Sequence, residues 1–422
     1  MARILIVGKG GYGDMFPLFS IAQALKGAGH AVTIAAERHH GPASSSIGVP
    51  LVPIDAASGS DHADRKPRSL LRSDRLEKLF GTLSPGNLEG EYELLTDVVR
   101  SNDLIVGNQL AYSGAIAAKK WVKPWVFCAP SPLAIPSYFD PPLFPYLHRL
   151  QQLVAPHGVA QDHFIHLARH ASALLMHANV RLQKRLNVYD RAHPRFEGMY
   201  SGLLNILPVS PRILSPQPDW PAHTVVTGFN WFEPTFMRNA NELERIAAFF
   251  ESGDKPVIIA PGGSKRTQPG VFFEACLAAC ERLGRRAIVI ASQRFHSQIR
   301  ASRDVLVSGY VPYSALFGGA SALIHSAGIG TIGWSMKYAL PSLLVPTDWD
   351  QFDNAHRARK LNLAAVMPKS ELKAPRIARA LESLLRDREL KDGLSEASKA
   401  VALEDGAKVA LAEIESLLCR LV

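Results

Sequence analysis

A glycine-rich segment that ends in a carboxylate is the first place where this sequence could do chemistry. It reads Gly8-Lys9-Gly10-Gly11-Tyr12-Gly13-Asp14 and follows the apolar run Ile4–Val7 directly. The spacing satisfies G-x-G-x-x-G, and an acid, Glu37, ends the next apolar run, as in dinucleotide-binding folds. One interpretation is therefore an NAD- or FAD-dependent oxidoreductase that uses the Gly8–Gly13 loop.

The position of Asp14 favours a different chemistry. Pro17 suits the first turn of a helix, so we expect the helix to begin near Asp14, later than a pyrophosphate-binding turn requires. A carboxylate there can be a simple helix cap, because free amides and the helix dipole stabilise it. It can equally be a general base at the carboxyl edge of a parallel sheet. On this segment alone both interpretations stay open.

A second candidate lies in the other half of the chain, where His325-Ser326-Ala327-Gly328-Ile329-Gly330-Thr331 follows an apolar strand and opens a helix. A lone histidine in that position can be structural. Small residues, free amides, a hydroxyl and an imidazole that converge on one spot nevertheless suit a diphosphate. The expected contacts are His325, Ala327, Gly328, Gly330 and Thr331.

Three further loops each follow a predicted strand in this half. Asp350 and Gln351 offer a carboxylate and an amide suited to sugar hydroxyls, although the pair alone could be a turn. Gly263 and Ser264, next to two cations, could form a second wall of a phosphate pocket or an exposed turn. Tyr310, with Val311 beside it, could stack a nucleobase or belong to the core.

These loops need strands and helices to position them, and the sequence alternates the two. Apolar, β-branched runs separated by helical patterns predict a parallel sheet in each half. Ser215–Pro234 accumulates prolines without helical period, as an interdomain connection does. We therefore predict an α/β protein with a first Rossmann-like domain over 1–215, a linker over 216–235, a second over 236–400, and a C-terminal helix over 401–422 that could return to the first domain.

Composition narrows the class of protein further. The chain has 422 residues, a formal net charge of +9 and four cysteines too scattered for a disulfide framework or a zinc knuckle. The basic run around Arg65–Lys78 has no aromatic platform or nucleic-acid motif, so we expect no nucleic-acid partner. The short apolar start and the lack of a long apolar run predict a cytoplasmic protein, with peripheral contact to the inner face of a membrane left open.

Taken in order, the motifs resemble the glycosyltransferase superfamily that contains UDP-glucuronosyltransferases, sterol glucosyltransferases, antibiotic glycosyltransferases and the rhamnolipid rhamnosyltransferase. The similarity covers nearly the whole chain. The family's G-x-x-G-D-x-x-P corresponds to Gly10 through Pro17, its phosphate turn to His325 through Thr331, and its donor-sugar Asp-Gln pair to Asp350-Gln351. The resemblance implies a glycosyltransferase-B fold, with two Rossmann-like domains facing across a cleft, and inverting, metal-independent transfer from a nucleotide sugar.

By the same resemblance, Asp14 is the general base, Gly13 belongs to the donor site, and the acceptor meets Asp14 in the N-terminal domain. Aromatic and proline-rich loops after Trp125–Cys128 favour a small lipophilic or aromatic acceptor, although they could be packed surface loops. The expected acceptor contacts are Phe16, Pro130, Phe139 and Phe144.

Departures from the family pattern bear on the donor. Ala327 stands where many members have glycine, and Tyr313 where plant-like members have a glutamine that contacts the base. Gly333 replaces a glutamate that binds both ribose hydroxyls. A 2'-deoxyribose does not need that glutamate, so dTDP-sugars become candidates beside UDP-sugars.

A binding protein without activity and a metal site are also compatible with parts of the sequence. A catalytically silent relative could bind a nucleotide sugar or lipid without turnover. Four histidines at helical spacing could suggest a metal, but no carboxylate completes an H-E-x-x-H ligand set, so we expect a structural or acceptor-facing role for them. They are His163, His166, His170 and His177.

Overall fold

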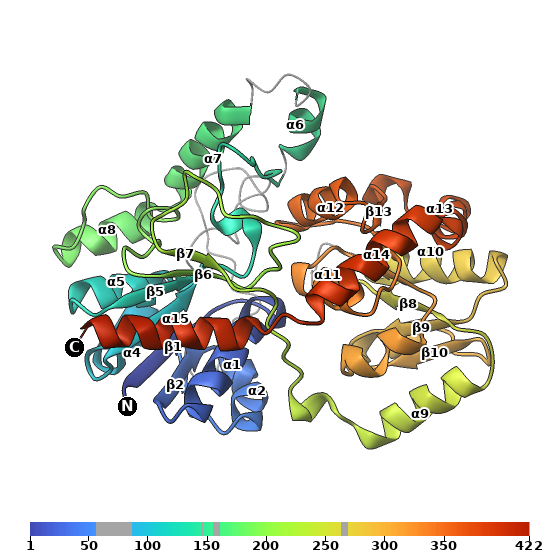
Figure 1. The fold of residues 1–422 in the computed structure, drawn as a ribbon, viewed down its shortest axis with the longest axis horizontal. Coiled ribbons are helices and arrows are strands. Elements are labelled where there is room, and N and C mark those ends of the chain that lie inside the picture. Colours follow the sequence, from blue (N-terminus) through green and yellow to red (C-terminus); the bar gives the residue numbers. More distant parts are fainter. Residues whose placement is uncertain (56–86, 146, 155–160, 263–268, 422) are drawn as a thin grey trace.

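The computed structural model of the protein describes residues 1–55, 87–145, 147–154, 161–262 and 269–421. They form two parallel sheets, each covered by helices on its faces (Figure 1). The two-domain α/β fold predicted from the sequence is confirmed. The apolar interior that stabilises each sheet is made of near-continuous hydrophobic strands, as expected when both faces of a parallel sheet are buried.

The first sheet has seven strands in the order β3-β2-β1-β4-β5-β6-β7. Its strands are β1 (Arg3–Val7), β2 (Ala31–Ala36), β3 (Leu51–Pro53), β4 (Leu104–Asn108), β5 (Trp125–Cys128), β6 (Asn205–Leu207) and β7 (Thr224–Val226). Its helices are α1 (Tyr12–Gly27), α2 (Gly41–Ser46), α4 (Leu88–Arg100), α5 (Tyr112–Lys120), α6 (His148–Val154), α7 (Gln161–Leu175) and α8 (His177–Arg185).

The second sheet has six strands in the order β10-β9-β8-β11-β12-β13. Its strands are β8 (Val257–Ala260), β9 (Ala287–Ile290), β10 (Val305–Ser308), β11 (Ala322–His325), β12 (Ser342–Leu344) and β13 (Ala365–Val366). The helices of this half are α9 (Ala240–Glu251), α10 (Pro269–Arg282), α11 (Ile329–Lys337), α12 (Gln351–Lys360), α13 (Ala374–Arg386), α14 (Arg388–Val401) and α15 (Gly406–Leu421).

Strand order explains where the candidate loops lie. In the first sheet the order reverses between β1 and β4, and in the second between β8 and β11. Open α/β sheets bind ligands beyond the carboxyl ends of the strands at such reversal points. The glycine loop follows β1 and the phosphate turn follows β11, so each lies at the reversal point of its own sheet.

The predicted linker contains a strand. Thr224–Val226 pairs in parallel with β6 and forms the edge of the first sheet, so residues 216–226 belong to the first domain and the connection to α9 starts after them. The strand is short and surrounded by prolines, which hides it from a pattern-based prediction. The strands β3 and β13 were not predicted either, because each is only two or three residues long.

The last helix crosses back to the first domain (Figure 1). Buried residues of α15, Ala410, Ile414 and Leu417, share one hydrophobic cluster with β1 and α1. Gly406 begins α15 against the linker: a Cβ on it would lie 2.2 Å from the carbonyl oxygen of Gly228. Glu404, just before α15, accepts a hydrogen bond of 2.9 Å from Phe229 N. The linker and the start of α15 therefore form one tightly packed crossing.

Across the described ranges, no helix is both long enough and apolar enough to span a membrane.

Candidate active site

The first candidate residue, Asp14, is held on both carboxylate oxygens. It lies in the first turn of α1, which begins at Tyr12, two residues before the predicted start. Its Oδ2 accepts a hydrogen bond of 3.0 Å from Gly11 N, and its Oδ1 accepts one of 2.9 Å from Gln109 Nε2. Asp14 therefore does cap its helix, while Gln109, which follows β4, fixes the orientation of the carboxylate from the neighbouring strand end.

The surroundings of Asp14 make it a weaker acid than a free aspartate. Burial raises its pKa to about 7, and the nearby Asp350 carboxylate adds to the shift, against the hydrogen bonds from Gly11 and Gln109. A carboxylate whose pKa lies near neutral pH can accept a proton and release it again at physiological pH. Gln109 Oε1 is buried beside it without a hydrogen-bond partner, so the pair presents one titratable group and one free acceptor.

The glycine loop is clamped by the end of the second strand. Glu37 Oε2 accepts a hydrogen bond of 3.2 Å from Gly10 N, and His40 Nε2 lies 3.0 Å from Gly10 O. Burial lowers the pKa of His40, so the neutral ring donates from Nε2 to that carbonyl. Gly10 has φ +113°, and a Cβ on it would lie 2.5 Å from Asp14 Oδ2, so only glycine fits.

That clamp argues against the dinucleotide interpretation. A pyrophosphate would need free backbone amides in the Gly8–Gly13 loop. The amide of Gly10 is already bound to Glu37, and the amide of Gly11 to Asp14. Glu37, the acid that completes the dinucleotide-type pattern in that interpretation, instead accepts a hydrogen bond from the loop.

The phosphate turn presents a single free ring donor. His325 is 1% exposed, and burial lowers its pKa to about 3, so the imidazole is neutral. Ala327 N donates to His325 Nδ1 at 3.3 Å, which places the ring hydrogen on Nε2, and Nε2 has no partner. Gly328 is the N-cap of α11 and supplies no side-chain cap, so the first amides of the helix remain available for an anion.

Ala327 carries the backbone strain of this turn. Its φ is +66°, in the left-handed region that favours glycine, and the residue is fully buried. Its carbonyl accepts a hydrogen bond of 3.1 Å from Asn354 Nδ2 of α12. The turn keeps the glycine-like geometry of related turns with an alanine in place.

We expect Ala327→Gly to stabilise the protein or leave it unchanged, with a gain of up to about 1 kcal/mol. Removing the Cβ relieves left-handed strain of about 1–2 kcal/mol, and the added freedom of glycine in the unfolded chain offsets part of it. Urea denaturation of both proteins measures the difference. Ala320→Gly, at a buried position with ordinary extended backbone, is the control and should be destabilised; a loss of stability of equal size in both variants would contradict the strain argument.

Asn354 links Asp350 to the phosphate turn. Its Nδ2 donates hydrogen bonds to Asp350 Oδ2 at 2.9 Å and to Ala327 O. Burial raises the pKa of Asp350. The side-chain carbonyl of Gln351 is already used within the protein: its Oε1 accepts hydrogen bonds of 2.9 Å from Thr347 N and 3.0 Å from Asp348 N. Only the side-chain NH2 group of Gln351 is left to donate a hydrogen bond to a sugar hydroxyl.

The two halves of the site meet across the interface between the domains. Asp14 and Asp350 lie close enough for the charge of Asp350 to raise the pKa of Asp14. Ser131, which follows β5, faces Asp350 closely enough to affect its pKa, yet its buried hydroxyl makes no hydrogen bond of normal geometry. A predicted base and a predicted sugar-binding carboxylate therefore each have a neighbour with an unpaired polar atom: Gln109 beside Asp14, and Ser131 and Asn354 beside Asp350. Sequence reasoning missed Gln109; it included Ser131 only as part of an acceptor loop and Asn354 only as part of the segment that follows Asp350, without a role for either side chain.

Tyr310 and Val311, the residues predicted to contact the nucleobase, differ in how accessible their side chains are to a ligand. Tyr310 is 46% exposed and lies near Tyr12 of the first domain. Val311 packs its side chain into the second domain, which leaves only its backbone for a ligand. Tyr313 reaches the phosphate turn instead: its hydroxyl lies 3.3 Å from Thr331 Oγ1.

Packing against the linker gives a structural reason for glycine at position 333, independent of any ligand. A Cβ there would lie 2.7 Å from the ring of Phe229 in the linker. A glutamate at this position would have to displace Phe229, so the linker fills the space that the family's ribose-binding glutamate needs.

The predicted acceptor residues divide into two groups. Phe139 is 68% exposed and is free to meet a ligand, whereas Phe144 is 6% exposed and packs in a small cluster with Leu133, Phe164 and Ile165. Pro130 is buried next to Ser131. Phe16 packs against Tyr12 and Phe232, with ring centroids 5.0 and 5.3 Å apart.

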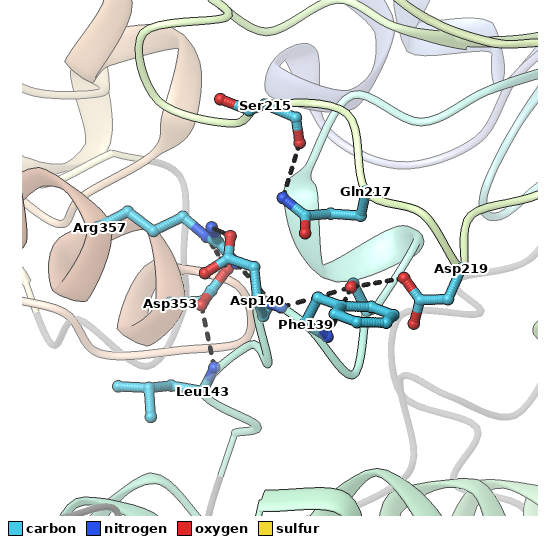
Figure 2. Close-up of polar contacts among 9 residues, drawn as sticks. Phe139, Asp140, Leu143, Ser215, Gln217, Asp219, Asp353 and Arg357 are labelled. Carbon is cyan, nitrogen blue, oxygen red and sulfur yellow. Dashed lines mark hydrogen bonds and ion pairs between the residues drawn. The ribbon is translucent and has the colours of Figure 1, made fainter. Parts of the chain in front are cut away.

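An ion-pair cluster joins the loop after β5 to α12 across the domain interface (Figure 2). Arg357 pairs with Asp140 of the loop and with Asp353 of its own helix, the latter at 2.8 Å. Asp353 Oδ1 also accepts a hydrogen bond of 2.9 Å from Leu143 N. Asp353 and Arg357 are buried, so their charges neutralise each other away from water.

The other end of this loop is held by the first domain. Asp219 accepts hydrogen bonds from Ser137 Oγ at 2.6 Å and from Tyr138 N at 2.7 Å. The loop is thus fixed at Asp219 on one side and at Arg357 on the other. We call Asp140, Leu143, Asp353 and Arg357 the interdomain cluster.

Some predicted residues fall elsewhere. Gly263 and Ser264, with the basic run over 65–78, lie outside the described residues. The neighbouring Gly262 is described, and a Cβ on it would lie 3.0 Å from Ser326 Oγ, so the loop after β8 does approach the phosphate turn.

The four histidines at helical spacing are exposed. They are spread over two helices, because α7 ends at Leu175 and His177 begins α8. Within the described ranges, the group of side chains close enough to share a metal ion is Glu37, His39 and His40. Two of these three already hold Gly10.

Comparison with known proteins shows what this chain is similar to. Residues 275–420 match the family model described as Erythromycin biosynthesis protein CIII-like, C-terminal domain. O-mycaminosyltylonolide 6-deoxyallosyltransferase of Streptomyces fradiae is 24% identical, over 98% of this chain and 97% of that protein. Sterol 3-beta-glucosyltransferase of Saccharomyces cerevisiae is 30% identical over 49% of this chain, which spans only 18% of that longer protein.

Solved structures agree on the fold. The calicheamicin glycosyltransferase CalG4 superposes with a TM-score of 0.71 at 16% identity, covering 100% of this chain and 99% of that one. The spinosyn rhamnosyltransferase SpnG, solved with thymidine diphosphate, gives 0.67 at 15% identity, over 98% and 99%. None of these relatives supports the oxidoreductase interpretation. With its two parallel sheets the chain has the GT-B fold of these solved glycosyltransferases, and in sequence it is similar to antibiotic and sterol glycosyltransferases.

Proposed function

We propose that this protein is an inverting glycosyltransferase that moves a hexose or deoxyhexose from a UDP- or dTDP-sugar to a hydroxyl of a small lipophilic or aromatic acceptor. One observation carries the proposal: Gln109, which binds Asp14, and Asn354, which binds Asp350, each keep a buried polar atom without a partner where the two domains meet. Buried polar groups are normally hydrogen-bonded, so a concentration of unpaired ones points to a polar ligand. These atoms are Gln109 Oε1, Ser131 Oγ, His325 Nε2 and Asn354 Oδ1.

In the proposed reaction Asp14 accepts the proton of the acceptor hydroxyl while that oxygen attacks the anomeric carbon. The bond from that carbon to the diphosphate oxygen breaks on the opposite side, which inverts the configuration. His325 Nε2–H and the first amides of α11 bind the departing diphosphate as its negative charge grows. Asp350 and the amide of Gln351 hold the sugar hydroxyls.

No step in this scheme uses a metal ion, because the leaving charge is met by His325 and helix amides. A chelator added to the assay tests that part of the proposal. The acceptor enters from the side of Phe16, Pro130 and Phe139, and Phe144 supports this wall from within its cluster. Tyr310 stacks on the nucleobase.

The donor is best sought among dTDP-deoxysugars first and UDP-glucose second. The Streptomyces relative is named for a 6-deoxyallose and the SpnG structure holds thymidine diphosphate, while the yeast relative is named for glucose. A thermal-shift panel of dTDP, UDP, NAD and NADP separates the possibilities, since a ligand that binds the native state raises its melting temperature. Stabilisation by NAD or NADP alone would contradict the proposal.

His325→Ala should lower turnover by roughly 10²-fold, because a preorganised donor to the leaving group is lost from a dry site. Steady-state kinetics with the donor found in the panel measure the change. Ser335→Ala, at another buried polar position of the same domain, is the control for general disturbance of the fold. Equal rates for wild type and His325→Ala would reduce His325 to a packing residue.

A further inference from the structure

The outer faces of α6 and α7 carry large apolar side chains that no described part of the chain covers. Leu150 and Leu153 of α6 are 51% and 77% exposed, and Leu167 and Leu174 of α7 are 50% and 79% exposed. We call these four residues the leucine face. Both helices lie at one extremity of the first domain (Figure 1).

These leucines are not needed to attach α7 to the protein. The helix is anchored by its opposite side, where Phe164 and Ile165 pack with Leu133 and Phe144. On the outer side, His163, Leu167, His170 and Leu174 follow each other at intervals of three or four residues, so one stripe of α7 alternates apolar and basic side chains. This stripe therefore presents both apolar and basic side chains to the solvent, whereas the core side of the helix is apolar.

Basic residues outnumber acidic ones on α6, α7 and α8. The sequences of α6 and α8 contain no aspartate or glutamate, and α7 contains one, Asp162. Two arginines nearby are already paired, Arg169 with Glu197 and Arg185 with Glu89. Exposed basic side chains on these helices remain beyond those pairs: Arg149, His163, His166, His170, His177, Arg181 and Lys184.

We propose that the leucine face docks on the surface of a membrane that contains anionic lipid. Leucines inserted among basic side chains suit the headgroup region, where the apolar part enters the acyl boundary and the cations meet lipid phosphates. A stable protein interface would instead concentrate aromatic residues in a core depleted of charge. This inference does not depend on the proposed transfer reaction, because it concerns a surface outside the Asp14–Asp350 site.

Vesicle co-sedimentation of the full chain tests the proposal. We expect binding to vesicles of phosphatidylcholine with about a third phosphatidylglycerol, and at least tenfold weaker binding to pure phosphatidylcholine, because the anionic lipid supplies the electrostatic attraction. Leu174→Asp should weaken binding to the anionic vesicles at least tenfold. Leu403→Asp is the matched control: Leu403 is 88% exposed, outside the leucine face, and its substitution should leave binding unchanged.

Three results would overturn the proposal. The wild-type chain could stay in the supernatant with anionic vesicles, or the Leu174 and Leu403 variants could lose binding equally. Light scattering could show a dimer that Leu174→Asp converts to monomer without any vesicle binding, which would make a second copy the partner of this face. Melting temperatures of both variants verify that they are folded, and the assay contains no nucleotide sugar, so failure here leaves the transfer proposal untouched.

Discussion

Replacing Asp14 by asparagine should lower sugar transfer by about 10²–10⁴-fold, the usual contribution of a positioned general base. The substitution keeps the shape of the side chain at position 14, and the amide oxygen of asparagine can still accept the hydrogen bond from Gly11 N. Gln109 can turn its unpaired Oε1 toward the new amide group. Nucleotide affinity should stay within a few fold of wild type, since His325 and the α11 amides are unchanged. Retained turnover would remove Asp14 from the mechanism.

The pH dependence of the same reaction gives a second readout. Asp14 must be deprotonated to act, and its pKa is raised to about 7, so wild-type turnover should increase with pH through about 7. Asp350 contributes to that shift through its charge, so Asp350→Asn should move the rise to lower pH. A rise that stays in place in Asp350→Asn would show that the two carboxylates do not share one site.

Stability separates the loss of a base from a damaged fold. The pKa of Asp14 is raised on folding, so the native state binds its proton more tightly than the unfolded chain, and stability falls as pH increases from about 4 through 7. Asp14→Asn has no such proton to lose. It should therefore match wild type at pH 4 and be the more stable protein at pH 8. A misfolded variant would be less stable at both.

The second large effect concerns the interdomain cluster. Arg357→Met should cost about 3–5 kcal/mol of unfolding free energy, because it leaves Asp353 buried without a counter-charge. Denaturant unfolding measures the loss. Arg359→Met on the same helix is the control, since that side chain is exposed and should change stability by less than about 0.5 kcal/mol.

Asp140→Asn distinguishes the interdomain part of this effect from the part inside α12. It breaks the pair with Arg357 but keeps the pair of Arg357 with Asp353, so stability should fall less than in Arg357→Met. Equal losses in the two variants would place the whole effect in the contact between the domains. Losses as small as that of Arg359→Met in both would contradict the buried-charge argument.

Much of the fold could be predicted from the sequence because strands of buried parallel sheets are continuous apolar runs. Ile4–Val7 and Val257–Ala260 are such runs, and each is followed by glycines that can only be a turn. The phosphate turn was visible for the same reason, since His325 stands where a buried strand gives way to small residues. Short edge strands such as Thr224–Val226 lack enough residues to show a period.

The rest of the site could not be predicted, because its contacts join residues that are distant in sequence. Nothing around Gln109 marks it as a neighbour of Asp14, and the proline-rich loop that contains Ser131 gives no sign that this hydroxyl faces Asp350; only the packing of strand ends does. Phe144 shows the opposite kind of error. The sequence predicts that its aromatic side chain contacts the acceptor, but residues of α7 pack over it. The acid Glu37 fits a ribose-binding pattern, but its structural partner is Gly10 N.

The return of α15 to α1 has a consequence for how the protein is made. The ribosome completes the strands of the first sheet early, yet Ala410, Ile414 and Leu417 of its hydrophobic cluster are added only after all the strands of the second sheet. The first domain therefore cannot close its core until α15 has been made, and the whole second sheet is synthesised while the first domain still exposes the α1 surface. A chimera that exchanges donor domains with a relative should accordingly keep α15 with the residues that precede β8, not with the segment that it follows in sequence.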